Sequence, residues 1–204
     1  MKFGLGQSVL REEDQRFLRG RGRYTDDINL PGQAASYILR SPFAHAEIKS
    51  VDIDAANQSP GVLAIYTGAD VADAGLGDLP SLSAKLYPLK RPDGDPIFVP
   101  PHPVLAQGKV AFVGDAVAFV VAETRDQARD AAELIEIDYG EFAVNTDTLA
   151  ASNVDTITIW EGCPDNVCFR FEAGDRAATD KALASADHVT SIALPMPRVA
   201  VNAM

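Results

Sequence analysis

Long apolar runs and cysteines are both scarce in this chain of 204 residues. The apolar run that contains residues 117–122 is far shorter than the roughly 20 residues that cross a bilayer, so we expect no membrane-spanning helix. Met1 and Lys2 are followed by a polar, Arg-rich stretch rather than by an apolar core, which predicts a cytoplasmic protein without a secretory leader. Without a leader, we expect Cys163 and Cys168 to be reduced thiols. Their spacing opens an iron–sulfur motif, but the chain has no further cysteine to complete it, so we expect no iron–sulfur cluster.

Positive charge is also in short supply. Lys and Arg number 18 against 29 Asp and Glu, and the formal net charge of −11 repels phosphate backbones. Residues 1–24 are the exception, because six bases against three acids give this segment +3 and leave −14 on the other 180 residues. We interpret the segment as solvated or partner-facing, and a contact with nucleic acid is the weaker alternative.

Histidine is rare, and the three present are scattered without a second ligand at metal spacing: His45, His102 and His188. We therefore expect no metal site. The glycine-containing stretch 20–24 lacks the third glycine and the flanking strand and helix of a phosphate-binding loop, so it is interpreted as a turn or hinge. Ser81 and Ser83 belong to no nucleophile elbow.

The remaining candidates for chemistry are one histidine and one pair of carboxylates. His45 has the chemistry of a general base, but spacing alone gives it no partner, and we predict a structural or interface role. Asp26 and Asp27 stand beside an expected turn, where capping explains them better than acid–base or metal chemistry. A small independent enzyme using His45 with Asp26 or Asp27 is kept as a minor hypothesis. No catalytic, cofactor-binding or metal-binding residue is assigned.

The first half of the chain has the pattern of short strands. We expect strands at 35–40, 47–53 and 62–66, with a helical turn at 55–58. The apolar run 62–66 suits a buried strand, and Thr67 and Asp70 can cap the turn that follows it.

Proline is concentrated in residues 80–103, which hold seven of the thirteen prolines. Because proline donates no backbone hydrogen bond and fixes φ, this stretch is predicted to be neither helix nor inner strand. We expect a long irregular lobe, of a kind that is often functional or forms an interface. Its apolar residues should hold it in place: Leu82, Leu86, Tyr87, Ile97 and Phe98.

Residues 110–139 give the clearest pattern. Gly114-Asp115 between the apolar runs 110–113 and 117–122 predicts a tight hairpin, and the second run, apolar on both faces, predicts a covered central strand. Thr124 and Gln127 have the spacing of a capping box. A helical apolar stripe and an alternating strand at 135–139 follow, which together predict a right-handed crossover. The stripe consists of Ala128, Ala131, Ala132 and Ile135.

The pattern after residue 143 suggests the start of a second unit. Residues 142–165 resemble a loop, and we expect strands at 169–172 and 189–194 around a helix at 175–186. The inward face of that helix should consist of Ala178, Ala182, Leu183 and Ala186. About 36 residues cannot close a core of their own, so the sequence looks cut or completed by another chain.

Several of these segments, taken in order, resemble one family. They are 20–27, 40–48, 60–62, 113–124, 128–132 and 137–139. This set resembles the amino-terminal part of the large, molybdenum-binding subunit of the xanthine dehydrogenase, aldehyde oxidase and carbon monoxide dehydrogenase family. Segments 166–170, 174–175 and 198–204 look like the linker and opening strand of its molybdopterin-binding domain. One departure follows Tyr139, where the chain reads Gly140-Glu-Phe-Ala instead of a Glu-x-Leu-Pro-like stretch.

The resemblance implies an α+β fold of the α/β-hammerhead type, with a mixed sheet, a crossover helix and an irregular proline-rich lobe. It divides the chain into an arm (1–15), a hammerhead domain (16–143), a linker (144–168) and the incomplete start of a molybdopterin-binding domain (169–204). Complete members oxidise a carbon centre, in a small carbonyl, a heterocycle or CO, with water as the oxygen source.

The implied cofactors are a molybdenum–pterin group in the complete subunit and 2Fe–2S and FAD on partner subunits or domains. The implied partners are those iron–sulfur and FAD subunits, with a homodimer of the heterotrimer possible. Because the pterin ligands and the catalytic base of the family lie beyond Met204, the chain alone is expected to be inactive, with a structural and docking role. The alternative is a stand-alone non-catalytic interaction domain of the same fold.

Overall fold

The computed structural model describes residue 6 and residues 10–87, 89–91, 93–153 and 155–194. The chain divides into two compact units, Met1–Gln33 with Pro197–Met204, and Ala34–Met196, which we describe separately. Most of the expected arm and the closing residues 195–204 lie outside the described residues. In the first unit, a loop joins α1 (Asp14–Phe17) to the 3-10 turn η1 (Thr25–Asp27). Phe17 at the end of α1 stacks on Tyr24 just before η1, with ring centroids 5.7 Å apart.

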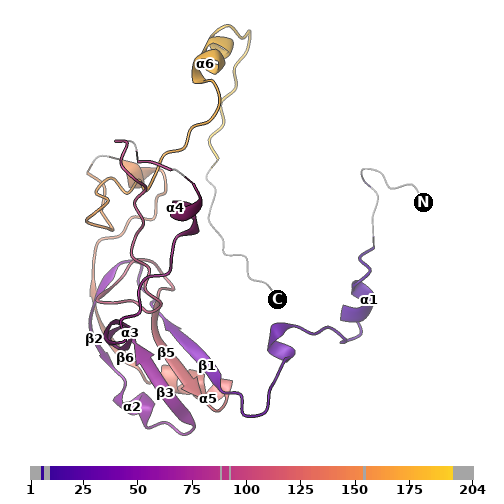
Figure 1. Ribbon diagram of the computed structural model, residues 1–204, viewed down its shortest axis with the longest axis vertical. Coiled ribbons are helices and arrows are strands. Elements are labelled where there is room, and N and C mark those ends of the chain that lie inside the picture. Colours follow the sequence, from indigo (N-terminus) through magenta and orange to yellow (C-terminus); the bar gives the residue numbers. More distant parts are fainter. Residues whose placement is uncertain (1–5, 7–9, 88, 92, 154, 195–204) are drawn as a thin grey trace. The chain divides into compact units, whose positions relative to one another are not determined.

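The second unit contains two antiparallel sheets of three strands each (Figure 1). The first sheet has the order β1 (Ala35–Arg40), β5 (Ala116–Ala122), β3 (Val62–Thr67), and the second has the order β4 (Lys109–Val110), β2 (Ala46–Asp52), β6 (Glu136–Glu141). The helical elements are α2 (Asp54–Asn57), α3 (Gly68–Asp73), α4 (Leu82–Leu86), α5 (Arg125–Ala132), η2 (Ala150–Ser152) and α6 (Arg176–Ala184). The predicted α+β class is confirmed, but all described strand pairings are antiparallel, so the predicted mixed sheet is wrong.

The predicted hairpin around Gly114-Asp115 is also wrong, because its two arms join different sheets. β4 pairs with β2, whereas β5 pairs with β1 and β3. The chain between them pairs with Ser41 instead: Ser41 N donates to Asp115 O and Gly114 N donates to Ser41 O, both at 2.8 Å. The Asp115 carboxylate closes the same turn by accepting from Ala111 N at 3.1 Å. Gly114 and Asp115, whose sequence is typical of a hairpin turn, therefore lie in a connection between two different sheets.

The strand–helix–strand unit exists, but it is no parallel crossover. β5 belongs to the first sheet, and β6, which follows α5, pairs antiparallel with β2 in the second. Val51 and Ile137 pack against both hydrophobic clusters, so the two sheets share side chains at this point. That shared packing is the physical reason for the change of sheet.

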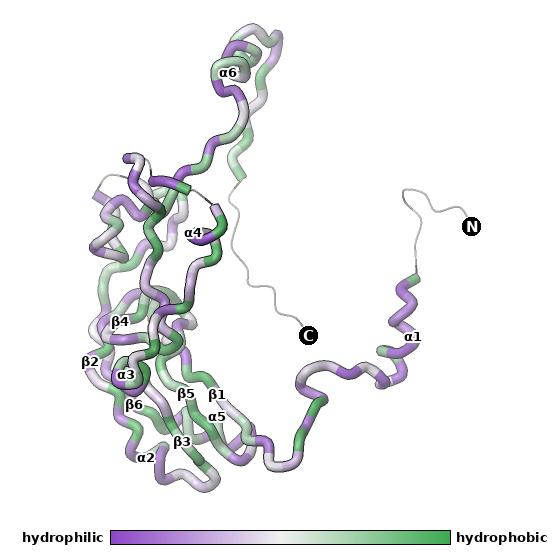
Figure 2. The backbone as a smooth tube through the Cα atoms, viewed as in Figure 1, coloured by the Kyte–Doolittle hydropathy of each residue, from purple (hydrophilic) through white to green (hydrophobic). Residues whose placement is uncertain are grey.

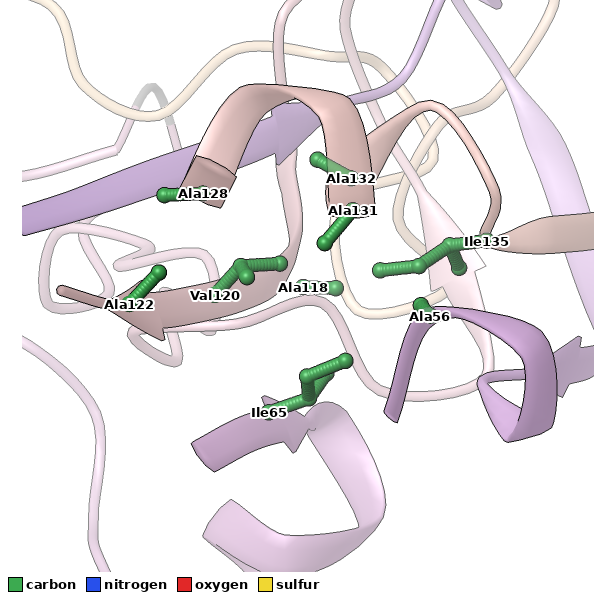
Figure 3. Packing of buried hydrophobic residues seen from close by; sticks show 9 residues of the cluster. All are labelled: Ala56, Ile65, Ala118, Val120, Ala122, Ala128, Ala131, Ala132 and Ile135. Atoms are coloured by element: carbon green, nitrogen blue, oxygen red, sulfur yellow. The ribbon is translucent and has the colours of Figure 1, made fainter. Parts of the chain in front are cut away.

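The main core lies between α5 and the first sheet (Figure 3). The predicted stripe of α5 is confirmed: three alanines and Ile135 are buried against β5, which is central in its sheet as expected. Alanine allows the helix to approach the strand closely, and β5 is coloured hydrophobic along its length (Figure 2). Thr124 caps the helix by accepting from Gln127 N. The cluster consists of Ala56, Ile65, Ala118, Val120, Ala122, Ala128, Ala131, Ala132 and Ile135.

β3 and α3 form one edge of this unit. β3 is an edge strand in which only Ile65 is fully buried, so the expectation of a buried strand holds for one residue of six. The predicted cap of α3 is confirmed, since Thr67 and Asp70 form a capping box. Gly68 opens the helix against the backbone of Ala106, where an added Cβ would collide with the carbonyl oxygen. Only glycine permits this close approach.

The C-terminal segment has local structure without a core. α6 forms as predicted, with Asp175 as its N-cap, but all of its residues are exposed, including the face expected to point inward. The expected strands at 169–172 and 189–194 are replaced by a single bridge between Arg170 and Lys90. A strand needs a partner along its length, whereas among the described residues Arg170 pairs only with Lys90 and residues 189–194 form no bridge. None of the helices in the described parts is long and apolar enough to cross a membrane.

Candidate functional site

The described residues provide no donor set for a metal ion. No group of three or more His, Cys, Asp and Glu side chains lies together among them. Cys163 is buried and Cys168 half-buried, and they form no disulfide. We therefore derive no chemical step through a metal or a molybdenum group held by this chain.

His45 packs between the start of β2 and the residues that follow β6. Its ring is 8% exposed, its Nδ1 lies 3.2 Å from Ala143 O, and its centroid lies 4.8 Å from that of Phe142. Phe142 N in turn donates to His45 O at 3.0 Å. These contacts attach the end of β6 to the start of β2. They support the predicted structural role.

Asp26 and Asp27 belong to the other unit, within η1. The Asp27 carboxylate accepts from Tyr24 N at 2.9 Å, so turn capping accounts for this residue. Gly20 adopts φ +65°, and Arg21 N donates to Arg16 O at 3.0 Å, so the glycine-containing stretch is a turn, as interpreted from the sequence. The structure thus places the histidine and the carboxylates in separate units.

Tyr139 is the buried phenol of this fold. Its hydroxyl oxygen is buried and has no hydrogen-bond partner among the described residues, and its ring lies 4.9 Å from that of Phe43. Burial raises the pKa of Tyr139. The nearby Ser41 hydroxyl partly offsets this rise in the pKa, and the negative charge of Asp115 adds to it. The alternating apolar pattern at 135–139 predicted that Tyr139 lies in a strand. It did not indicate that the hydroxyl is unpaired.

The proline-rich lobe is anchored by an arginine that the sequence pattern did not single out. The Arg91 side chain is 12% exposed; it donates to Asp165 Oδ1 at 3.1 Å and to Cys163 Sγ at 3.3 Å. Val167 N also donates to the Asp165 carboxylate, and this bond, with the Arg91 guanidinium, holds the pKa of Asp165 below its usual range despite partial burial. Sequence alone could not find this pair, because its members are 74 positions apart.

Backbone and ring contacts strengthen the same attachment. Phe98 N donates to Cys168 O at 3.0 Å, and the Phe98 ring lies against Gly162, where a Cβ would collide with it. The ammonium of Lys109 lies 4.3 Å from the centroid of the Trp160 ring and donates to Ile159 O at 3.0 Å. Residues 159–168 therefore fix one side of the lobe to the body that the two sheets and α5 form.

The other end of the lobe is an exposed apolar helix. Contrary to the sequence prediction, residues Leu82–Leu86 form α4, because the six residues between Pro80 and Tyr87 contain no proline. Of the five apolar residues expected to hold the lobe, Ile97 and Phe98 are half-buried, but three remain exposed: Leu82 at 68%, Leu86 at 66% and Tyr87 at 60%. We call these three residues the α4 surface. It is an apolar patch on a lobe that is itself held in place.

A family model for the aldehyde oxidase and xanthine dehydrogenase a/b hammerhead domain matches residues 19–142. The carbon monoxide dehydrogenase large chain of Afipia carboxidovorans is 37% identical over 199 residues, covering 92% of this chain and 23% of that one. The nicotine 6-hydroxylase large subunit of Paenarthrobacter nicotinovorans is 36% identical, covering 98% of this chain and 23% of that one. The chain thus spans about a quarter of the length of these curated relatives.

Solved structures agree with these matches. The Cu,Mo-CO dehydrogenase in its carbon monoxide reduced state matches with a TM-score of 0.69 and 37% identity, covering 91% of this chain and 23% of that chain. The aldehyde oxidoreductase of Desulfovibrio gigas matches with a TM-score of 0.65 and 29% identity over 87% of this chain and 19% of that one. The two antiparallel sheets and α5 are therefore an architecture that solved enzymes share.

Proposed function

Because the chain belongs to the aldehyde oxidase and xanthine dehydrogenase family, as its hammerhead match shows, we propose that it is part of the large subunit of a molybdenum hydroxylase. The complete enzyme oxidises a small carbonyl, a heterocycle or CO with water as the oxygen source. Within it, residues 1–204 act as a structural and subunit-docking part without an active site of their own. This proposal extends to the whole protein what is established for the family of its hammerhead domain.

The cofactors of the complete enzyme follow from the same premise. A molybdenum–pterin group is held by residues outside this chain, and 2Fe–2S and FAD are carried by partner subunits or domains. The assembly is cytoplasmic, and two heterotrimers pair in it. The contribution of residues 1–204 is to hold cofactor-bearing parts in fixed register, because electron transfer falls steeply with distance.

The observation that carries the docking role is the α4 surface. Leu82 and Leu86 are separated by one helical turn, so they lie on one face of α4, and Tyr87 extends the patch. Exposed apolar patches on an ordered support are typical of protein interaction sites. The support here is the Arg91–Asp165 pair, in which Arg91 Nη2 lies 3.1 Å from Asp165 Oδ1. A patch of this kind meets a partner without first having to be ordered, which lowers the entropic cost of association.

The test uses the complete large subunit coexpressed with its iron–sulfur and FAD subunits. We expect the double variant Leu82→Asp, Leu86→Asp to reduce copurification of a partner subunit at least about tenfold, which corresponds to roughly 1.4 kcal/mol of binding free energy. Leu134→Asp is the matched control, since Leu134 is 48% exposed and lies after α5, away from the lobe in sequence. Melting temperatures of all variants are measured to exclude unfolding.

Unchanged assembly and turnover in the double variant would refute the docking role of this surface. Failure of the wild-type chain to associate with any large-subunit partner would instead favour the stand-alone interaction domain. In that case a pull-down with the α4 surface intact and altered identifies the alternative ligand.

A further inference from the structure

The first sheet has a second apolar face, opposite the one that α5 covers. Ile38 on β1 and Tyr66 on β3 are both register partners of Phe119 on β5, so the three side chains form one row across the sheet. Ile38 is 38% exposed and Tyr66 48% exposed. The central strand β5 is thus apolar on both faces, as its sequence indicated, but on the second face Val117 is buried whereas Phe119 and Val121 are only half-buried by the described residues.

This row forms the floor of an open apolar cavity of about 590 Å³. One wall comes from α3 and the turn after it, where Val71 is buried and Leu76 is 57% exposed. Val104 and Leu105 also line the cavity. A cavity of this size and lining has room for several apolar side chains, and its exposed area is favourable to bury.

The charge at the rim of the cavity has one sign. Asp70 and Asp73 of α3 line it, and none of the Lys and Arg residues in the described part of the chain does so. The Asp70 carboxylate is held in place, because it accepts from Thr67 N and Thr67 Oγ1, both at 2.7 Å. An apolar element that enters beside these carboxylates is stabilised when it carries a positive charge at its edge.

We infer that this cavity is a docking site for an apolar segment flanked by Lys or Arg, supplied by the part of the same large subunit that lies outside residues 1–204. The inference rests on the proposed function, because the chain spans about a quarter of its relatives and the remainder of such a subunit is available to cover the face. A sheet that is apolar on both faces is stable when a second layer packs on each of them. The site is separate from the α4 surface, since the two share no residue.

The test places a photo-cross-linker in the cavity of the complete subunit, coexpressed with its partners. Leu76→p-benzoylphenylalanine reports what lies over the cavity, and Leu134→p-benzoylphenylalanine is the control at a similarly exposed leucine. After irradiation, mass spectrometry should identify a cross-link from position 76 to an apolar peptide that contains Lys or Arg, within the same polypeptide and outside residues 1–204. The control position should not reach that peptide.

A cross-link to another subunit, to a second copy of this chain, or only to residues 1–204 overturns the inference, as does the absence of any cross-link. None of these outcomes bears on the α4 surface, so the proposed function is judged independently by copurification. Charge reversal gives a second measurement: Asp73→Lys should lower the melting temperature of the complete subunit by several degrees more than Asp130→Lys, which makes the same change on the exposed side of α5. Equal effects of the two variants would contradict the basic flank.

Discussion

The helices α5 and α6 are nearly the same length, are rich in alanine and begin with the same device. In each, the N-cap side chain accepts a hydrogen bond from a backbone N–H three residues later: Gln127 N to Thr124 in α5, and Ala178 N to Asp175 in α6. Yet three alanines of α5 are buried, whereas no residue of α6 is. Local sequence specifies that a helix forms; burial depends on whether a complementary face exists to receive it.

The strongest way to break this comparison is to place a charge on the alanine face of each helix. Ala131→Asp puts a carboxylate where the side chain is 0% exposed, and we expect it to lower the free energy of unfolding by about 3 kcal/mol or more. Ala178→Asp, on the exposed α6, should change it by less than about 0.5 kcal/mol. Urea denaturation of both variants decides the matter. A large loss in Ala178→Asp would mean that α6 packs against something.

The same contrast can be tested with cavities instead of charge. Val120→Ala removes two methyl groups at a fully buried position of β5 and should cost about 2 kcal/mol, from lost transfer free energy and the cavity left behind. Leu183→Ala removes a larger side chain from α6, but Leu183 is 52% exposed, and we expect a loss below about 0.5 kcal/mol. Equal losses, measured by thermal denaturation, would contradict a core confined to the hammerhead body.

The elements that the sequence predicted correctly are those whose signal is local. The strand at 35–40, the α5 stripe and the caps at Thr67 and Thr124 depend on residues within one or two turns of each other. The incorrect ones depend on distant partners. The turn at Gly114-Asp115 was interpreted as a hairpin because no neighbouring residue reveals that Ser41 pairs with it. Ser41 precedes Gly114 by 73 positions.

The α4 surface, Arg91 and the apolar row on the first sheet likewise depend on residues that are distant in the sequence or masked by the local composition. The α4 surface was predicted only as part of an irregular lobe. The seven prolines of residues 80–103 dominated that prediction, although the helical turn at 82–86 contains no proline. Arg91 was not singled out, since the Asp165 carboxylate and the Cys163 thiol to which it donates stand more than 70 positions away. The row of Ile38, Phe119 and Tyr66 was indicated only by the two-faced apolarity of 117–122, because register decides which side chains become neighbours.

The two N-caps offer a finer test of the comparison, since the same local interaction is removed in two environments. Thr124→Ala should cost about 1 kcal/mol of global stability, because α5 is part of the cooperative core. Asp175→Ala should reduce helical circular dichroism from α6 while leaving the main unfolding transition unchanged, because α6 unfolds without exposing buried surface. A shifted main transition in Asp175→Ala would show that α6 is coupled to the body.

Low pH should lower the stability of the two-sheet body by weakening the Asp70 cap of α3, without a comparable effect through the cap of α6. The Thr67 hydroxyl and backbone N–H donate to Asp70 and lower the pKa of its carboxyl below its usual value. A carboxyl whose pKa is lower in the folded state contributes stability above the unfolded pKa of about 3.9, and this stability is lost as pH falls through the folded pKa. Because Asp70 is exposed, the effect should stay below about 1 kcal/mol. Denaturation at pH 5 and at lower pH should therefore show a smaller acid-induced loss in Asp70→Asn than in the wild type. Asp175→Asn, which alters the cap of a helix that packs on none of the described residues, should follow the wild-type curve.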